Sequence, residues 1–306
     1  MFATRILITG ANGLLGQALV RRLSGSSDHD VLATARDDAP RFDVPCEYTT
    51  MDVTTPDDVN TVVQDYEPDV VVNCAAVSDI SECEEDRNRA WAVNARAVRT
   101  LAKQCRSLNA HLVQVSSDFV FNGKRGPYDE KARPDPVNYY GRTKLAGENA
   151  LREFDFLDWA IVRTVLLYGT AKDLSRSNVV LWMIDQLSKG EVIHVVDDQR
   201  RTPTYAPDLA DGIVRLIDRE KTGIFHLSGR EMVTIHELAE TVAEVFDFDT
   251  SLVDPVSSDY FEEALERPPK TGFIILKAET ELGYDPRPLK EGLRAVGREL
   301  GLLPTS

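Results

Sequence analysis

The sequence has few of the features that mark a secreted, membrane-spanning or metal-binding protein. Its four cysteines, at positions 46, 74, 83 and 105, show neither Cys-x-x-Cys spacing nor a nearby histidine at metal-site spacing. Its hydrophobic runs have the length of single strands, which excludes a transmembrane helix. The start of the chain runs into a strand-like segment and glycines, unlike a signal peptide. We therefore expect a cytoplasmic protein with reduced thiols and no metal.

Positive charge is also scarce. The chain has 35 lysines and arginines against 50 aspartates and glutamates, so its formal net charge is −15. A surface of this sign repels nucleic-acid phosphates and anionic membranes, and we expect neither as a partner. The acids are spread along the chain, and adaptation to high salt is an interpretation that the sequence leaves open. Any anionic ligand must rely on local Arg, Lys and backbone N–H groups.

The first half of the chain has the pattern of an α/β protein. Short β-branched runs alternate with amphipathic stretches, which predicts parallel strands joined by helical crossovers. We expect strands at residues 5–9, 31–35, 69–73, 111–116 and 159–164, and helices at 14–23, 56–66, 83–107 and 139–154.

The second half is less regular. It predicts helices at 177–188, 207–219, 235–245 and 288–300, with extended segments at 193–196 and 224–227. We predict a Rossmann-type, doubly wound parallel sheet in residues 1–164. Residues 165–306 are expected to form a smaller α/β substrate-binding lobe that is partly interleaved with the first.

A glycine-rich turn separates the first strand from the first helix. Residues 6–16 read ILITGANGLLG, with Gly10, Gly13 and Gly16 at regular spacing. Gly10 permits a tight turn, Gly13 lets a pyrophosphate approach the backbone, and Gly16 lets the helix pack close to the sheet. The helix N-terminus presents unpaired N–H groups to phosphate. The turn predicts a dinucleotide site, to which Asn12, Leu14 and Leu15 also belong.

The end of the second strand indicates which dinucleotide binds. An acid usually stands there when the adenosine ribose has a free 2′-hydroxyl, whereas this chain has Arg36, which suits a 2′-phosphate. A solvated loop arginine is the alternative interpretation. We predict NADP as the cofactor, with NAD as the alternative.

Two further segments carry candidate catalytic groups. Tyr140 and Lys144 stand four residues apart, which places them on one face of a helix. A neighbouring ammonium lowers the pKa of a phenol, whose ordinary value of about 10 makes it a sluggish proton donor. Ser117 ends a strand, where open α/β sheets place their active sites, and can orient a ketone oxygen. Each feature alone is common, but together with the glycine turn they predict a reductase.

The chain resembles the dTDP-4-dehydrorhamnose reductases and the wider group of nucleotide-sugar reductases, which are extended short-chain dehydrogenases. The resemblance is carried by VVNCAA at 71–76, SDFVFNG at 117–123, NYYGRTKLAGE at 138–148 and DDQRRTPT at 197–204. It covers nearly the whole chain and is weakest between residues 247 and 266.

The resemblance implies a catalytic triad of Ser117, Tyr140 and Lys144, with Lys144 also holding the nicotinamide ribose. It also implies a role for Asn94 in proton relay, although a structural mid-helix asparagine explains that residue equally well. Further residues implied at the cofactor are Asp52, Val53, Ala75 and Ala76, and those implied at the substrate are Asn178, Trp182, Arg200, Arg201, Tyr205 and Arg267.

The residues after Ser117 favour reduction over related chemistries. Nucleotide-sugar dehydratases carry an Asp-Glu pair there, whereas this chain has Asp118 and Phe119. The 4-epimerases usually show an acid where Arg36 stands. The resemblance therefore implies that NADPH reduces the C4 ketone of a nucleotide-linked deoxyketosugar, with Tyr140 donating the proton.

Two alternatives and several details stay open. The regulatory β subunit of methionine adenosyltransferase resembles the same reductases and binds NADP as a partner protein, and an epimerase is the second alternative. Family members commonly have Phe-Gly where this chain has Arg200 and Arg201, so the nucleotide and the sugar are left undecided. A homodimer is expected only from the resemblance.

Overall fold

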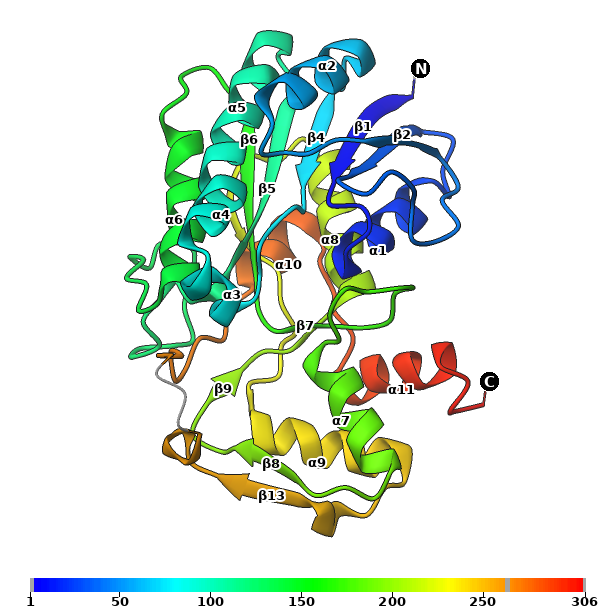
Figure 1. Ribbon diagram of the computed structural model, residues 1–306, viewed down its shortest axis with the longest axis vertical. Helices are drawn as coiled ribbons and strands as arrows, with labels where there is room; N and C mark the ends of the chain where they lie inside the picture. Colours follow the sequence, from blue (N-terminus) through cyan, green and yellow to red (C-terminus); the bar gives the residue numbers. More distant parts are fainter. Residues whose placement is uncertain (1–2, 262–264, 305–306) are drawn as a thin grey trace.

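The larger lobe is built on a seven-stranded sheet in the order β11-β6-β5-β4-β1-β2-β3 (Figure 1). The computed structural model describes residues 3–261 and 265–304. All six strand pairs of this sheet are parallel, which confirms the predicted Rossmann-type α/β fold. The strands are β1 (Thr4–Thr9), β2 (His29–Ala35), β3 (Glu47–Thr50), β4 (Val70–Asn73), β5 (His111–Ser117), β6 (Trp159–Thr164) and β11 (Gly223–His226).

Helices cover both faces of this sheet. Residues Ile6 and Ile8 of β1 pack with α1 (Leu14–Leu23), α8 (Ala206–Asp218) and α10 (Leu276–Leu282). Leu7, between them, faces the opposite core with α2 (Pro56–Tyr66), α5 (Ala97–Leu108) and α6 (Tyr139–Arg152). Because both faces are buried, the central strands are continuous hydrophobic runs, which is why they could be predicted.

The single helix predicted at residues 83–107 is wrong. The segment forms α3 (Ile80–Glu85), α4 (Arg87–Trp91), a π-helical turn at Ala92–Arg96, and then α5. The Asp79 carboxylate accepts hydrogen bonds from the first backbone N–H groups of α3, and Asp86 accepts one from Arg89. A capping acid inside the segment ends one helix and starts the next.

The smaller lobe has its own core. The helices α7 (Val179–Ser188), α9 (Ile235–Phe246) and α11 (Leu289–Glu299) pack around β8 (Ile193–Val196), which pairs in parallel with β13 (Val253–Val256). Two short pairs connect the lobes: β7 (Leu167–Tyr168) with β10 (Thr204–Tyr205), and β9 (Arg200–Arg201) with β12 (Val233–Thr234).

The chain crosses between the lobes more than once. After β6 it enters the smaller lobe, then returns through α8 and β11, and β11 pairs with β6 as the outermost strand of the large sheet (Figure 1). Later it returns again through α10, which packs beside α8 and β11. Across residues 3–261 and 265–304, no helix combines the length and the hydrophobicity that a membrane crossing requires.

Candidate active site

The glycine turn forms a tightly packed cradle at the carboxyl end of β1. Gly10 has φ +66°, and a Cβ there would lie 2.8 Å from the backbone nitrogen of Ala75. A Cβ on Gly16 would lie 2.3 Å from the Gly10 carbonyl oxygen. Gly13 is the N-cap of α1 and provides no capping side chain. The first N–H groups of α1, from Leu14 onward, therefore face an open edge, an arrangement that fits a phosphate group.

The loop after β2 is tied to this turn through an acid that the sequence reasoning missed. Asn12 Nδ2 donates to Asp37 Oδ2 at 2.8 Å, and Arg41 Nε lies 2.9 Å from the same oxygen. The Asn12 hydrogen bond and the Arg41 guanidinium hold the pKa of Asp37 below its usual value. Arg36, the preceding residue, is exposed at this edge. The available signal was an acid two positions beyond the end of β2.

The other predicted cofactor residues lie along the same edge of the sheet. Asp52 and Val53 follow β3, where Asp52 Oδ1 accepts hydrogen bonds from the backbone and hydroxyl of Thr54 at 2.8 and 2.7 Å. Ala75 and Ala76 follow β4, and Ala75 N donates to Thr9 Oγ1 at 3.3 Å. Carboxyl ends of neighbouring parallel strands meet at one edge, which gathers these residues beside the glycine turn.

Ser117, Tyr140 and Lys144 come together at the end of β5. Asn138 caps α6, with its Oδ1 accepting from Gly141 N at 2.9 Å. A Cβ on Gly141 would lie 2.1 Å from the Phe119 carbonyl oxygen, so this glycine lets α6 approach the segment after Ser117. The Ser117 side chain lies close enough to the Tyr140 phenol to lower its pKa, and Lys144 Nζ donates to the Val115 carbonyl at 2.8 Å.

The ionisation of these groups corrects one expectation. We expected Lys144 to lower the pKa of Tyr140, but burial raises it above its usual value, against a lowering by the Ser117 hydrogen bond. Burial also lowers the pKa of Lys144 to about 8, against a raising by the Glu148 carboxylate. Desolvation disfavours the charged form of both groups and is the largest influence on each pKa.

The predicted substrate residues divide into two groups. Asn178 caps α7 and donates to the Gly169 carbonyl at 2.8 Å, while the Tyr205 hydroxyl donates to Glu299 Oε1 at 2.6 Å, so both have partners within the smaller lobe. Trp182 on α7 is 40% exposed. Arg200 is also exposed, 3.8 Å from Glu237.

Arg201 is brought to the catalytic segment. It is 3% exposed, and its Nε lies 3.9 Å from Asp118 Oδ2, directly after Ser117. The exposed Arg267 is close enough for its charge to lower the pKa of Arg201. Asp118 and its second partner, Thr271, were not identified from the sequence as site residues. Asp118 was signalled by adjacency to Ser117, whereas Thr271 comes from 153 positions further along the chain.

Asn94 lies in the π-helical turn, and its side chain hydrogen-bonds with the Val77 backbone and the Thr143 hydroxyl. Its Oδ1 accepts from Val77 N at 3.0 Å, and its Nδ2 donates to the Val77 carbonyl at 2.9 Å and to Thr143 Oγ1 at 3.0 Å. These bonds connect the loop after β4 with α6. Asn94 therefore helps to hold α6, the helix that carries Tyr140 and Lys144, in place.

Comparison with known proteins places these features in a family. The family described as "RmlD substrate binding domain" matches residues 4–301. The chain is 37% identical to the "dTDP-4-keto-6-deoxy-D-glucose reductase" of Streptomyces niveus over 301 residues, covering 98% of this chain and 92% of the relative. It is 33% identical to the "Methionine adenosyltransferase 2 subunit beta" of Mus musculus over 297 residues, covering 95% and 86%.

A solved structure gives the same result in three dimensions. The crystal structure of dTDP-4-dehydrorhamnose reductase from Bacillus anthracis in complex with NADP superposes with a TM-score of 0.86 at 32% identity, covering 97% of this chain and 99% of that chain. The resemblance stated from the sequence is thereby confirmed. Since the family pattern spans nearly all of its length, this chain belongs to the RmlD substrate binding domain family.

Proposed function

We propose that this protein is an NADPH-dependent reductase that converts the C4 ketone of a nucleotide-linked deoxyketosugar into an alcohol. The observation that carries the proposal is the juxtaposition of Ser117, Tyr140 and Lys144 at the sheet edge that also holds the glycine turn. The reductase names of the relatives and the NADP in the similar crystal structure support this assignment.

In this proposal the first lobe, residues 1–164, holds the cofactor. The turn from Gly10 to Gly16 and the N-terminus of α1 would bind the pyrophosphate, and Arg36 would bind the 2′-phosphate. Asp52 and Val53 would lie at the adenine, and Ala75, Ala76, Tyr140 and Lys144 along the nicotinamide half. When bound, NADPH supplies the hydride.

Tyr140 would donate the proton to the ketone oxygen. Its raised pKa keeps the phenol protonated at neutral pH, as a proton donor requires. Ser117 would orient the ketone by hydrogen bonding. Lys144, with a pKa of about 8, is still mostly an ammonium at pH 7 and would hold the ribose.

The second lobe, residues 165–306, would bind the nucleotide sugar. Its diphosphate needs positive charge in an acidic protein, and the exposed Arg267 places such charge beside the catalytic segment, close to the buried Arg201. Trp182, partly exposed on α7, offers a flat surface to the base or sugar. Asn178 and Tyr205 would shape the lobe around the ligand.

The test is NADPH oxidation with a panel of dTDP- and UDP-linked 4-ketosugars, comparing the wild type with Tyr140→Phe. We expect turnover by the wild type on at least one ketosugar. Tyr140→Phe is expected to lower kcat by about 10²–10⁴-fold, because it removes the proton donor, while NADPH affinity stays within about twofold. Turnover that survives in Tyr140→Phe would contradict the assigned role.

The same experiment separates the alternatives. The β subunit of methionine adenosyltransferase is similar over most of its length, which favours a binding subunit as the second candidate. A chain that binds NADPH but reduces no ketosugar would support that candidate. Isomerisation of a UDP-sugar without net NADPH consumption would instead support an epimerase.

We also retain two expectations as proposals. We propose that the protein is a homodimer, as the resemblance to the reductases implies. We also propose that it lies in the cytoplasm, because nucleotide sugars are made and consumed in that compartment. Light scattering on the purified protein would measure its mass in solution directly.

A further inference from the structure

Asp118 is a buried acid that the proposed reaction leaves unused. Its side chain is 3% exposed, and it begins the short 3-10 turn that follows Ser117. Burial raises the pKa of this carboxyl, while Arg201, Thr271 and Ser117 lower it. A buried carboxylate is tolerated only when hydrogen bonds and an opposite charge compensate its lost hydration, so the neighbours of Asp118 decide its state.

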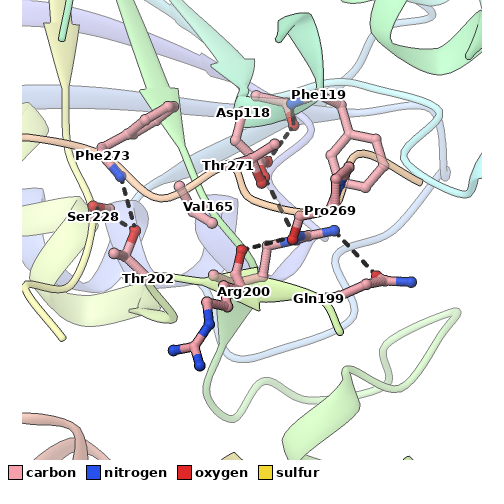
Figure 2. Close-up of polar contacts among 12 residues, drawn as sticks. Asp118, Phe119, Val165, Gln199, Arg200, Thr202, Ser228, Pro269, Thr271 and Phe273 are labelled. Atoms are coloured by element: carbon pink, nitrogen blue, oxygen red, sulfur yellow. Dashed lines mark hydrogen bonds and ion pairs between the residues drawn. The ribbon is translucent and has the colours of Figure 1, made fainter. Parts of the chain in front are cut away.

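Both carboxylate oxygens of Asp118 have partners. Ser117 Oγ donates to Oδ1 at 3.0 Å, and Thr271 Oγ1 donates to Oδ2. The Arg201 Nε atom lies 3.9 Å from Oδ2. Figure 2 shows Asp118 and Thr271 facing each other. Two donors and a guanidinium favour the ionised carboxylate and oppose the effect of burial on its pKa.

Arg201 is held in this position by the smaller lobe. Its Nη1 donates to the carbonyl oxygens of Arg200 and Pro269 at 2.8 and 3.2 Å, and its Nη2 donates to Gln199 Oε1 at 3.2 Å. Gln199, Arg200 and Pro269 surround the cluster in Figure 2. The guanidinium is therefore fixed as a counter-charge, because these bonds use three of its other four N–H groups.

The cluster continues to the proton donor. The Arg201 guanidinium lies 5.7 Å from the centre of the Phe119 ring, which in turn meets the Tyr140 ring edge-on at 5.7 Å. An ionised carboxylate only accepts hydrogen bonds, so the Ser117 hydrogen is committed to Asp118. The Ser117 oxygen accepts from Phe119 N at 3.2 Å and lies beside the Tyr140 phenol, whose pKa it lowers.

We propose that Asp118 is a positioning residue for the reduction: it holds the Ser117 hydroxyl in place and keeps a buried negative charge beside Tyr140, and Arg201 of the smaller lobe balances that charge. The inference rests on the proposed function. The negative charge opposes formation of a phenolate, so Tyr140 keeps the proton that it donates to the ketone. Other titratable groups facing this pair are Cys83, Lys144 and Arg267.

The central test is Asp118→Asn, which keeps the shape of the side chain and removes its charge. Activity falls at alkaline pH as Lys144, whose pKa is about 8, and then Tyr140 lose their protons. Asp118 raises the pKa of Tyr140, so its neutralisation lowers that pKa and moves the Tyr140 ionisation, the later part of the alkaline limb of the kcat profile, to lower pH. We also expect kcat at pH 7 to fall about tenfold because Ser117 is less well oriented, with KM changed less than about twofold.

Thr202→Val is the matched control. Thr202 is buried next to Arg201 and donates to Ser228 Oγ at 3.1 Å, without contacting Asp118. A structural disturbance of this region would affect both variants, whereas only Asp118→Asn should move the alkaline limb. An unshifted limb in a folded Asp118→Asn protein overturns the proposal.

Thr271→Val keeps the test decisive if Asp118→Asn does not fold. It removes one donor to Asp118, which raises the pKa of that carboxyl further. Activity that needs ionised Asp118 is lost as pH falls through this pKa, so the acid limb should move to higher pH. Thr271→Ser, which keeps the hydroxyl, should restore the wild-type limb. Identical acid limbs in Thr271→Val and the wild type would contradict the inference.

A measurement without turnover separates this inference from the proposed function. The ionisation of Tyr140 can be followed by ultraviolet absorbance in the full-length protein, as the difference between each variant and its Tyr140→Phe counterpart. If no ketosugar is reduced but this phenol ionises at lower pH in Asp118→Asn, the reductase assignment fails and the electrostatic role of Asp118 stands. If the phenol does not respond either, both are wrong.

Discussion

Lys144 is a charged residue placed where charge is costly. Its side chain is 5% exposed, and burial lowers its pKa from 10.5 to about 8. Below pH 8 the folded protein must bury an ammonium, whereas the unfolded chain solvates it. The folded state therefore pays about 2–3 kcal/mol at pH 7, and this cost shrinks as the pH rises from 8 towards 10.5.

We predict that Lys144→Met stabilises the protein at pH 7 while removing its activity. The free energy of unfolding should rise by about 2 kcal/mol at pH 7, and the gain should be smaller at pH 10. The Val115 carbonyl keeps a hydrogen bond from Gln114 Nε2 at 2.8 Å, so the substitution does not leave it without a donor.

Urea unfolding at the two pH values measures this effect. Lys103→Met, on the exposed side of α5, is the control and should leave stability unchanged at both. A Lys144→Met protein that is no more stable than the wild type at pH 7 would refute the assigned cost.

At the residue scale, local sequence was enough to find Ser117, Tyr140 and Lys144. Their spacing along one strand end and one helix is set by the chain itself. The partners of Asp118 could not be found in this way, because Arg201 and Thr271 reach it only through the packing of one lobe on the other. The state of Tyr140 was also mispredicted, since burial is a property of the folded molecule.

Elements were predictable where burial leaves a periodic pattern. The central strands and most helices have such patterns, but β3 is a partly exposed edge strand of Glu, Tyr and Thr without an apolar run, and it was missed. The helix α10 was missed as well, because it is only one to two turns long. The acids that cap α3 and α4, Asp79 and Asp86, are visible in the sequence, but we predicted one continuous helix over most of this segment.

The packing of α1 on the sheet gives a prediction at this scale. In Gly16→Ala the new methyl carbon would lie 2.3 Å from the Gly10 carbonyl oxygen and 2.6 Å from Ala11 Cα, and both are backbone atoms that cannot move independently. The helix must shift away from the turn. We expect NADPH affinity to fall at least about tenfold and the free energy of unfolding to fall by about 1–3 kcal/mol.

Gly25→Ala is the matched control for this substitution. Its methyl carbon would meet nothing closer than 3.8 Å, at the Arg21 carbonyl, so neither affinity nor stability should change appreciably. Fluorescence titration with NADPH and urea unfolding measure the two effects. Unchanged NADPH binding in Gly16→Ala would argue against this turn as the pyrophosphate site.

At the scale of the whole molecule, the two lobes share their structural elements. The larger sheet takes its last strand, β11, from residues 223–226, and α1 packs against α8 from residues 206–218. The sequence predicted an interleaved chain, but which segments return could not be known, because strand order depends on long-range pairing.

We therefore predict that a fragment of residues 1–164 does not fold on its own. It would expose the edge of β6 and the hydrophobic face of α1, both of which are covered in the full chain. Size-exclusion chromatography and circular dichroism should show aggregation, whereas the full-length chain should be well dispersed. A dispersed fragment with native-like helix content and NADPH affinity would contradict this prediction.

The late strand also has a consequence for biosynthesis. The strand β6 ends at Thr164, but β11, which pairs with its outer edge, ends at His226. At a translation rate of roughly 5–20 residues per second, the β6 edge waits several seconds for its partner to leave the ribosome. During that interval the nascent chain carries an unpaired strand edge and an uncovered hydrophobic helix, which makes this incomplete protein a natural client for ribosome-associated chaperones.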